Sequence, residues 1–340
     1  MTQIASTTCA ADGTITTFTL TGETLTPLAT SPVGKGVSAM AVDESARRAY
    51  VSLKEPTGVA TVQLDAQAGI WQQTHHHRLP THPSYLRISE DGRFLLGADY
   101  GGNLGLVWPL DDGKLGEPTA RISHQRLHCV VQRDQFVYFI SLGDDLVAGY
   151  RLTDEGGLEV VDEATVACPP GSGPRHAVIS EDGRTLYVVT EFSGEVLRFA
   201  RETATGALRH EQTVVAHDTS AGLQHSVIDE DPLANHYVWG ADLHLAGPEG
   251  RWLVVSERTE STLAVLPVAD DGTLAEPVHL QRVNTQPRGF VVTPDANHVL
   301  CPGEKSDQLG LFRIEDDGRL VEVAQVPNGA GANWVRVVEG

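Results

Sequence analysis

The chain has 340 residues, of which 41% are hydrophobic and 21% charged, and this composition excludes an intrinsically disordered protein. Its 25 basic and 45 acidic side chains give a formal net charge of −20, which argues against nucleic acid or an anionic membrane as a partner. The first 20 residues lack the basic start and apolar core of a signal peptide, and no later stretch is apolar enough to span a bilayer. We therefore expect a cytoplasmic protein.

The cysteines indicate neither a disulfide framework nor a zinc site. They lie far apart and form no CxxC pair, at Cys9, Cys129, Cys168 and Cys301. Four reduced thiols are the expectation.

One pattern of turn, apolar strand, polar loop and apolar strand recurs six times along the chain, at 44–64, 90–110, 132–152, 181–199, 248–268 and 294–314. The residues expected just before the first of the two strands are Arg47, Arg93, Gln135, Arg184, Arg251 and His298. Their intervals are 46, 42, 49, 67 and 47 residues. A period of about 40 to 50 residues is typical of β-propeller blades.

Each unit is predicted to be a four-stranded blade. The strands are short and rich in Val, Leu, Ile and Tyr, and Asp-Asp-Gly turns at 111–113, 270–272 and 316–318 introduce a further strand. Residues 332–338 resemble an innermost strand with nothing after it, whereas 3–20 supply two or three strands with no innermost strand before them. Joining the two ends predicts an all-β, seven-bladed propeller, a single domain over 1–340, with no exposed sheet edge.

The 67-residue interval is about 20 residues longer than the others, and the excess lies in 216–239. A long propeller loop is often functional or an interaction element, although plain surface decoration explains it nearly as well.

Charged and imidazole side chains stand just before or at the start of several predicted innermost strands, where they would face the mouth of the central channel. They occur in the segments 81–84, 127–129, 175–176, 241–244 and 286–289. Taken singly, Arg175 and Arg288 could be structural ion-pair partners and His128 a structural histidine. Their convergence predicts a polar pocket.

The chain resembles the β-propeller lactonases, above all the bacterial 6-phosphogluconolactonases, which are related to the fungal 3-carboxymuconate lactonizing enzymes. The resemblance covers nearly the whole chain and is carried by GSGPRH (171–176), TE (190–191), WGADLH (239–244), QPRGF (286–290) and NWVRV (333–337). It implies a propeller that requires no metal or other cofactor and catalytic groups at His128, Arg175, Glu191 and Arg288. The chain departs from the family at SLG (141–143), at Cys129 and in the longer 216–239 loop.

Lactone hydrolysis needs a base that activates water and a group that stabilises the developing oxyanion. His128 or Glu191 could be the base, whereas arginine stays protonated and suits anion binding. We expect Arg175 to stabilise the oxyanion and Arg288 to bind an anionic substituent. His176 and His244 are candidates for substrate binding, with a supporting hydrogen-bond role as the equally good alternative. Lys35 and Lys305 are candidates for binding a phosphate, with a surface role favoured for each.

The predicted activity is hydrolysis of 6-phosphogluconolactone to 6-phosphogluconate by a monomer or weak homo-oligomer that binds a small anionic sugar lactone. A lactonase or lactonizing enzyme for another carboxylated lactone, and a non-enzymatic binding platform, are the alternatives.

The run His75–His77 lacks an accompanying acidic or cysteine ligand and is read as a solvated outer strand. Residues 100–103 lack the strand-to-helix context of a phosphate loop and are read as a turn.

Overall fold

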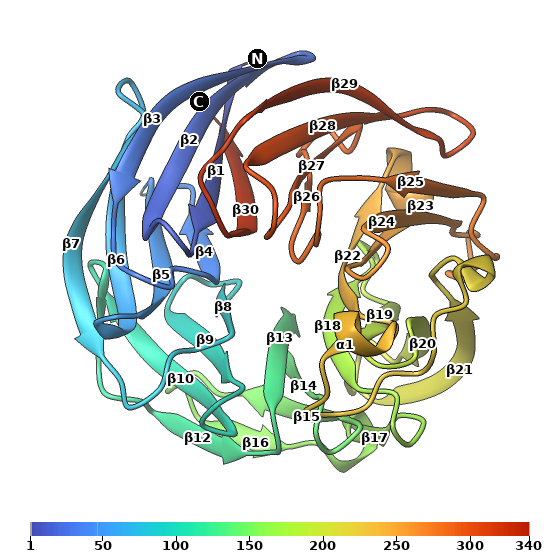
Figure 1. Cartoon of the computed structure of the whole chain (residues 1–340). Coiled ribbons are helices and arrows are strands. Elements are labelled where there is room, and N and C mark those ends of the chain that lie inside the picture. Colours follow the sequence, from blue (N-terminus) through green and yellow to red (C-terminus); the bar gives the residue numbers. More distant parts are fainter. Residues whose placement is uncertain (1, 46, 340) are drawn as a thin grey trace.

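The computed structural model describes residues 2–45 and 47–339, which form seven antiparallel sheets arranged in a ring (Figure 1). Each sheet is one blade, and its strands lie side by side from the centre of the ring to its rim. The predicted seven-bladed, all-β architecture is confirmed.

We number the blades from the first sheet that is built from consecutive strands. Blade 1 contains β4 (Met40–Asp43), β5 (Arg48–Lys54), β6 (Thr57–Asp65) and β7 (Ile70–Arg78). Blade 2 contains β8 (Tyr85–Ile88), β9 (Phe94–Asp99), β10 (Leu104–Asp111), β11 (Lys114–Leu115) and β12 (Ala120–Ser123). Blade 3 contains β13 (Leu127–Arg133), β14 (Phe136–Ser141), β15 (Leu146–Leu152), β16 (Leu158–Val160) and β17 (Val166–Ala167).

The remaining blades follow the same plan. Blade 4 contains β18 (Pro174–Ile179), β19 (Thr185–Thr190), β20 (Glu195–Arg201) and β21 (Leu208–Val215). Blade 5 contains β22 (Gly240–Ala246), β23 (Trp252–Glu257), β24 (Thr262–Pro267) and β25 (His279–Arg282). Blade 6 contains β26 (Val291–Val292), β27 (His298–Pro302), β28 (Gln308–Ile314) and β29 (Leu320–Pro327). Blade 7 contains β1 (Thr2–Cys9), β2 (Thr14–Thr21), β3 (Thr24–Pro32) and β30 (Ala332–Glu339).

Helical segments are few and short. They are the 3₁₀ turns η1 (Asp162–Ala164), η2 (Thr219–Ala221) and η3 (Pro248–Gly250) and the single-turn helix α1 (Pro232–Asn235). Within 2–45 and 47–339, no helix has the length and apolar character needed to cross a bilayer.

Blade 7 closes the ring through both ends of the chain. β1 pairs with β2 on one side and with β30 on the other, and Gln3 lies opposite Glu339 in the β1–β30 ladder. The predicted closure of the ring by both ends of the chain is confirmed. Residues 3–20 were predicted to supply two or three strands, but the third strand, β3, lies outside this range, at 24–32. The other predicted strand starts hold to within one residue, with β27 beginning at His298 itself.

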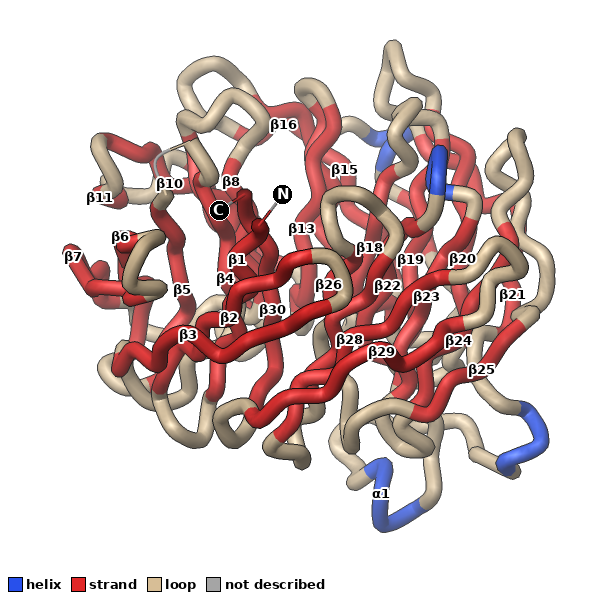
Figure 2. Tube along the Cα trace, turned by 90° about the horizontal axis from the view of Figure 1, so that it is seen from above, coloured by secondary structure: helices blue, strands red, loops and turns tan. Residues whose placement is uncertain are grey.

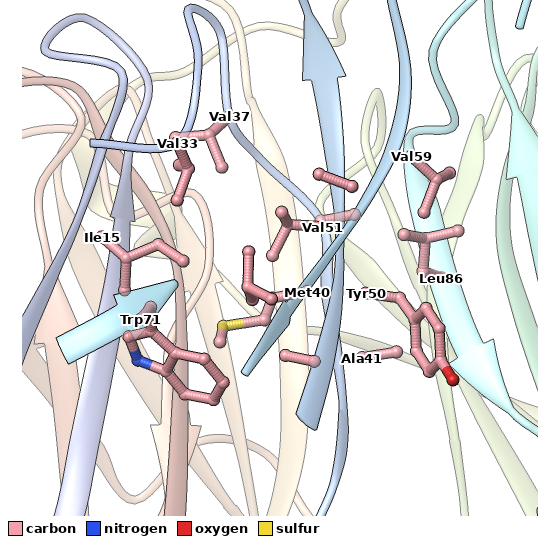
Figure 3. Close-up of a cluster of buried hydrophobic side chains, with 14 of the residues drawn as sticks. Ile15, Val33, Val37, Met40, Ala41, Tyr50, Val51, Val59, Trp71 and Leu86 are labelled. Carbon is pink, nitrogen blue, oxygen red and sulfur yellow. The ribbon is translucent and has the colours of Figure 1, made fainter. Parts of the chain in front are cut away.

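The hydrophobic core lies between the blades. One cluster joins blades 7, 1 and 2, and Figure 3 shows Trp71 beside Met40 and Tyr50 on the side of Leu86. Trp71 is 2% exposed, and its indole nitrogen donates to Ser6 Oγ of blade 7 at 3.0 Å. Because the apolar faces of neighbouring sheets bury one another, each blade depends on the blades beside it. All four cysteines are buried, and each is a free thiol, as expected.

The strand register decides which residues reach the end of the ring where the candidate site lies. Pro174 at the start of β18 is opposite Thr190 at the end of β19, and Gly240 at the start of β22 is opposite Glu257 at the end of β23. In both blades the start of the innermost strand and the end of the second strand therefore meet at one end of the ring. We call this end the front face.

Candidate active site

Arg175 and Glu191 form a buried ion pair at the front face of blade 4. Arg175 Nε donates to Glu191 Oε2 at 2.7 Å, and Arg175 Nη1 donates to the carbonyl oxygen of Ala241 in blade 5. The Arg175 side chain is only 1% exposed. A buried guanidinium is tolerated because its charge is compensated and its donors are occupied.

Arg258 binds the same carboxylate from blade 5. Its Nη2 lies 3.0 Å from Glu191 Oε2, and its guanidinium lies over the Trp239 ring at 3.7 Å from the ring centroid. The Trp239 indole nitrogen donates to Glu191 Oε1 at 3.3 Å. One carboxylate is thus shared by two arginines that are 1% and 2% exposed, so the cluster of Arg175, Glu191 and Arg258 carries a net positive charge.

The ionisation of Glu191 follows from this arrangement. Burial alone would raise the pKa of Glu191, but Arg258, Arg175 and Arg288 outweigh burial and hold the pKa below its usual value. Glu191 is therefore a carboxylate at neutral pH, and both of its oxygens accept hydrogen bonds from neighbouring side chains.

Arg288, which precedes β26, is the most open arginine of the group. Its side chain is 38% exposed, and Nη1 lies 3.3 Å from Glu304 Oε1 of the same blade. Its positive charge lowers the pKa of Glu191 and of His128. A substrate arriving at the front face would meet Arg288 before the two buried arginines.

His128 and His176 lie next to each other on the innermost strands of blades 3 and 4. Their ring centroids are 5.1 Å apart, and His128 Nδ1 is buried with no hydrogen-bond partner among the described residues. Burial, together with the charges of Arg175, His176 and Arg288, holds the pKa of His128 well below its usual value. The imidazole is therefore neutral at neutral pH and can accept a proton.

His176 is oriented by a buried carboxylate of blade 5. Its Nδ1 lies 2.8 Å from Asp242 Oδ1. Burial would raise the pKa of Asp242, but His244 and His176 hold it well below its usual value, so the carboxylate can only accept hydrogen bonds. The His176 proton is thus assigned to Nδ1, which leaves an unprotonated Nε2 that has no partner within 2–45 and 47–339. His244 is more open, and its Nε2 lies 3.3 Å from the other oxygen of Asp242.

A glycine allows blades 4 and 5 to approach each other at this point. A Cβ atom on Gly240 would lie 2.2 Å from the carbonyl oxygen of Thr190, and Gly240 N donates to the carbonyl oxygen of Glu191 at 3.0 Å. Any larger residue would push the two strands apart. The close contact brings Asp242 within reach of His176 and Arg258 within reach of Glu191.

Aromatic rings surround His176 on the inner strands. Tyr85 of β8 and Trp334 of β30 contact the His176 ring edge-to-face, with centroid distances of 5.2 and 5.7 Å. Burial and the charge of Arg175 lower the pKa of His176 to about 4, although Asp242 acts in the opposite direction. The arrangement suits acyl transfer to water: neutral imidazoles lie beside a positively charged arginine cluster, in surroundings from which water is largely excluded.

Comparison with known proteins identifies the family of the chain. The family model described as "Lactonase, 7-bladed beta-propeller" matches residues 2–337. The chain belongs to this lactonase family.

This lactonase is similar to proteins that are named gluconolactonases or 6-phosphogluconolactonases. It is 30% identical over 319 residues to a protein named 6-phosphogluconolactonase from Pectobacterium carotovorum, with 92% of each chain covered. Among solved structures, it is similar to a periplasmic gluconolactonase from Pseudomonas aeruginosa, with 28% identity, 99% of each chain covered and a TM-score of 0.86. A putative 6-phosphogluconolactonase from Bacteroides uniformis has the same fold, with 23% identity, 99% coverage of each chain and a TM-score of 0.86.

The lactonase structure brings together six of the eight residues expected at the site. His128, Arg175, His176, Glu191, His244 and Arg288 lie at the front face of blades 3 to 6. Lys35, which precedes blade 1, is exposed and pairs with Glu55 at 3.8 Å. Lys305 follows Glu304, the ion-pair partner of Arg288, and lines a groove of about 690 Å³ with Glu304 and Asp307. The roles of all eight residues stay predictions.

Sequence reasoning missed Arg258, Asp242, Trp239 and Tyr100. Arg258 follows β23 just as Glu191 follows β19, so comparing equivalent positions of the repeat could have found it. Asp242 lies inside the quoted segment WGADLH, but its partner His176 is 66 residues away and no local pattern joins them.

The run His75–His77 lies on outer strand β7, and no group of three or more potential metal-ligating side chains occurs within the described residues.

Proposed function

We propose that this lactonase hydrolyses a six-carbon sugar lactone, with 6-phosphogluconolactone as its substrate. The observation that carries the proposal is the pair of buried arginines on one carboxylate, next to two neutral imidazoles of which one is held by Asp242. The relatives named 6-phosphogluconolactonase support the choice of substrate.

In the proposed reaction, His128 takes a proton from water while the water oxygen attacks the lactone carbonyl carbon. The bond from this carbon to the ring oxygen then breaks, and the imidazolium returns the proton to the ring oxygen, which gives the open hydroxy acid. The charge that develops on the carbonyl oxygen is stabilised by the net positive charge of the Arg175–Glu191–Arg258 cluster.

The remaining residues act around this step. Asp242 pairs with His176 Nδ1 and fixes that ring beside His128, with 5.1 Å between the two ring centroids. Glu191 fixes the two buried arginines and is not the base in this proposal, since its oxygens are bound by them and by Trp239. Arg288 binds the anionic substituent of the substrate from the open side.

A panel of lactones tests the proposal. Hydrolysis of 6-phosphogluconolactone, glucono-1,5-lactone, a sugar-acid lactone and a muconolactone is compared with the spontaneous rate at slightly acidic pH. The expected result is the highest kcat/KM for the phosphorylated lactone, with Lys114→Met, an exposed position on strand β11, as a control that retains parental activity. If the sugar-acid lactone or the muconolactone were preferred, that class of lactone would be the substrate. If the protein hydrolysed no lactone faster than the spontaneous rate, the proposed function would be wrong.

We also propose that the protein acts in the cytoplasm, on the basis of its four free cysteines, since a reducing compartment keeps thiols out of disulfides. Fractionation of cells that express the untagged chain tests this location, and recovery from the periplasm would contradict it.

A further inference from the structure

The 216–239 loop runs from the outermost strand of blade 4 to the innermost strand of blade 5 and folds back over the front face. It carries η2 and α1, and α1 lies over blade 4 in Figure 1 and beyond the strand ends in Figure 2. Its two ends are tied together, because Gln224 N donates to the carbonyl of His236 and Val238 N donates to the carbonyl of Gln224. Ser226 N also donates to the carbonyl oxygen of Phe192 in blade 4 at 2.9 Å.

The tip of this loop crosses blade 4 and is bound to blade 3. Arg126, the residue before β13, donates from Nη1 to Asp229 Oδ1 at 2.9 Å and from Nη2 to Asp229 Oδ2 at 2.7 Å. This two-pronged geometry makes the Arg126–Asp229 pair directional as well as attractive. Loop and blade are therefore joined at a defined point, although the Asp229 side chain is 70% exposed.

Arg126 connects the loop to the candidate base. Its Nη1 also donates to the Tyr100 hydroxyl at 2.7 Å, and its guanidinium lies 5.4 Å from the centroid of the Tyr100 ring. The Tyr100 ring in turn contacts the His128 ring edge-to-face at 5.7 Å. An unbroken series of contacts therefore leads from Asp229 through Arg126 and Tyr100 to His128.

The backbone of Arg126 reinforces this connection. Its φ of 52° is in the left-handed region, which a residue with a side chain adopts at a cost of about 1 kcal/mol or more. Asn103 Oδ1 accepts a hydrogen bond from Arg126 N at 2.7 Å and helps to hold this conformation. Since His128 follows only two residues later, movement of Arg126 would be transmitted to the start of β13 through the backbone as well.

We propose that Arg126 and Asp229 are positioning residues for His128, and that the 216–239 loop is the part of this chain that fastens them. The pair holds Tyr100 against the imidazole and keeps His128 in the orientation that accepts a proton from water. The expected effect of this pair on kcat rests on the proposed lactone hydrolysis. Its effect on the orientation of the His128 ring does not depend on that function.

The experiment compares Asp229→Asn, Arg126→Met and the double variant with Glu230→Gln as a matched control. Glu230 is the next residue and undergoes the same charge change, but among the described residues its carboxylate accepts only from Tyr237, within the loop, at 2.8 Å. Asp229→Glu tests rescue. The measurements are kcat and KM on the lactone that the parent cleaves fastest, the NMR signal of the His128 ring, and amide exchange in 216–239.

For Asp229→Asn we expect kcat to fall by about twofold to fivefold, the range that an exposed ion pair supports, while KM changes less. The double variant should be no slower than Arg126→Met, Asp229→Glu should recover part of kcat, and the His128 signal should move in Asp229→Asn and Arg126→Met but not in Glu230→Gln. Faster loop exchange with parental kcat and an unmoved His128 signal would overturn the proposal. If the parent cleaves no lactone, the proposed function fails, and the His128 signal alone decides the positioning role.

Discussion

Arg258 and Glu191 belong to neighbouring blades, yet Arg258 Nη2 lies 3.0 Å from the Glu191 oxygen that also accepts from Arg175 at 2.7 Å. The candidate site is therefore built across the junction of blades 4 and 5 and not within one of them. Any change in how these blades pack will change the spacing of the charged groups.

Replacing Glu191 by glutamine should destabilise the fold strongly. Glutamine keeps the shape but removes the charge that compensates two buried guanidinium groups, and breaking a buried ion pair costs about 3–5 kcal/mol. Urea unfolding measures the free energy of unfolding, with the exposed Glu163→Gln as a control expected to change it by less than about 0.5 kcal/mol. Equal stability of the two variants would show that the arginines are compensated in another way.

Methionine at Arg175 or Arg288 should separate the two proposed roles of arginine. Arg175→Met should lower kcat for neutral and phosphorylated lactones alike, by on the order of a hundredfold, because the oxyanion loses a charge-stabilising group. Arg288→Met should mainly raise KM for the phosphorylated lactone and matter little for glucono-1,5-lactone. Lysine should rescue only partly at either position. Near-parental kcat/KM of both methionine variants on every lactone would place the site elsewhere.

The buried imidazoles predict a loss of stability in mild acid. Burial lowers the pKa of His176 from 6.5 to about 4, so above pH 6.5 the ring is neutral in both the folded and the unfolded chain. As the pH falls from 6.5 to about 4, the unfolded chain binds a proton that the folded one does not, which costs on the order of 3 kcal/mol. Urea unfolding between pH 7.5 and 5 measures this slope. His176→Asn should make it shallower, and the exposed His210→Asn should not; an identical slope in all three proteins would refute the assignment.

Activity should survive exhaustive dialysis against a chelator. The proposed chemistry assigns the electrophilic role to arginines, whereas a metal-dependent lactonase would place a divalent ion against the carbonyl oxygen. The measurement is kcat/KM before and after chelation, followed by addition of divalent ions. A rate that is lost on chelation and restored by a metal would show that the arginine roles are wrong.

Deleting residues 1–20 should open the ring. The deletion removes β1 and nearly all of β2, which leaves β30 without its partner and exposes a sheet edge. Thermal melting and size-exclusion chromatography should show loss of the cooperative transition and association between molecules. A monomer that melts at the parental temperature would count against closure as a source of stability.

The repeat explains why the fold could be predicted from the sequence. Alternating turns and apolar strands at a spacing of 40 to 50 residues leave few arrangements other than a propeller, and the unmatched strands at the two ends predict blade 7. Arg175 and His176 could be placed at the front face because they precede or begin an innermost strand, whose position follows from the same repeat.

Contacts between blades were beyond sequence reasoning. Asp242 approaches His176 only because Gly240 lets two strands come close, and Asp229 meets Arg126, 103 residues earlier in the chain, only because a loop crosses a whole blade. Lys35 illustrates the same point, since its ion pair with Glu55 at 3.8 Å could not be predicted from the sequence around either residue. Local patterns specify strands and turns, whereas these partners depend on how the blades pack.

The pairing of β1 with β30 also governs the order in which the molecule can be completed. During synthesis β1, β2 and β3 emerge first, but their innermost partner lies at the opposite end of the chain, at 332–339. The other six sheets consist of consecutive strands and can pair as they emerge, whereas blade 7 has to wait until almost the whole chain is available. Until then the β1–β3 hairpins carry an unpaired edge, so nascent chains should be most dependent on chaperones just before β30 is released.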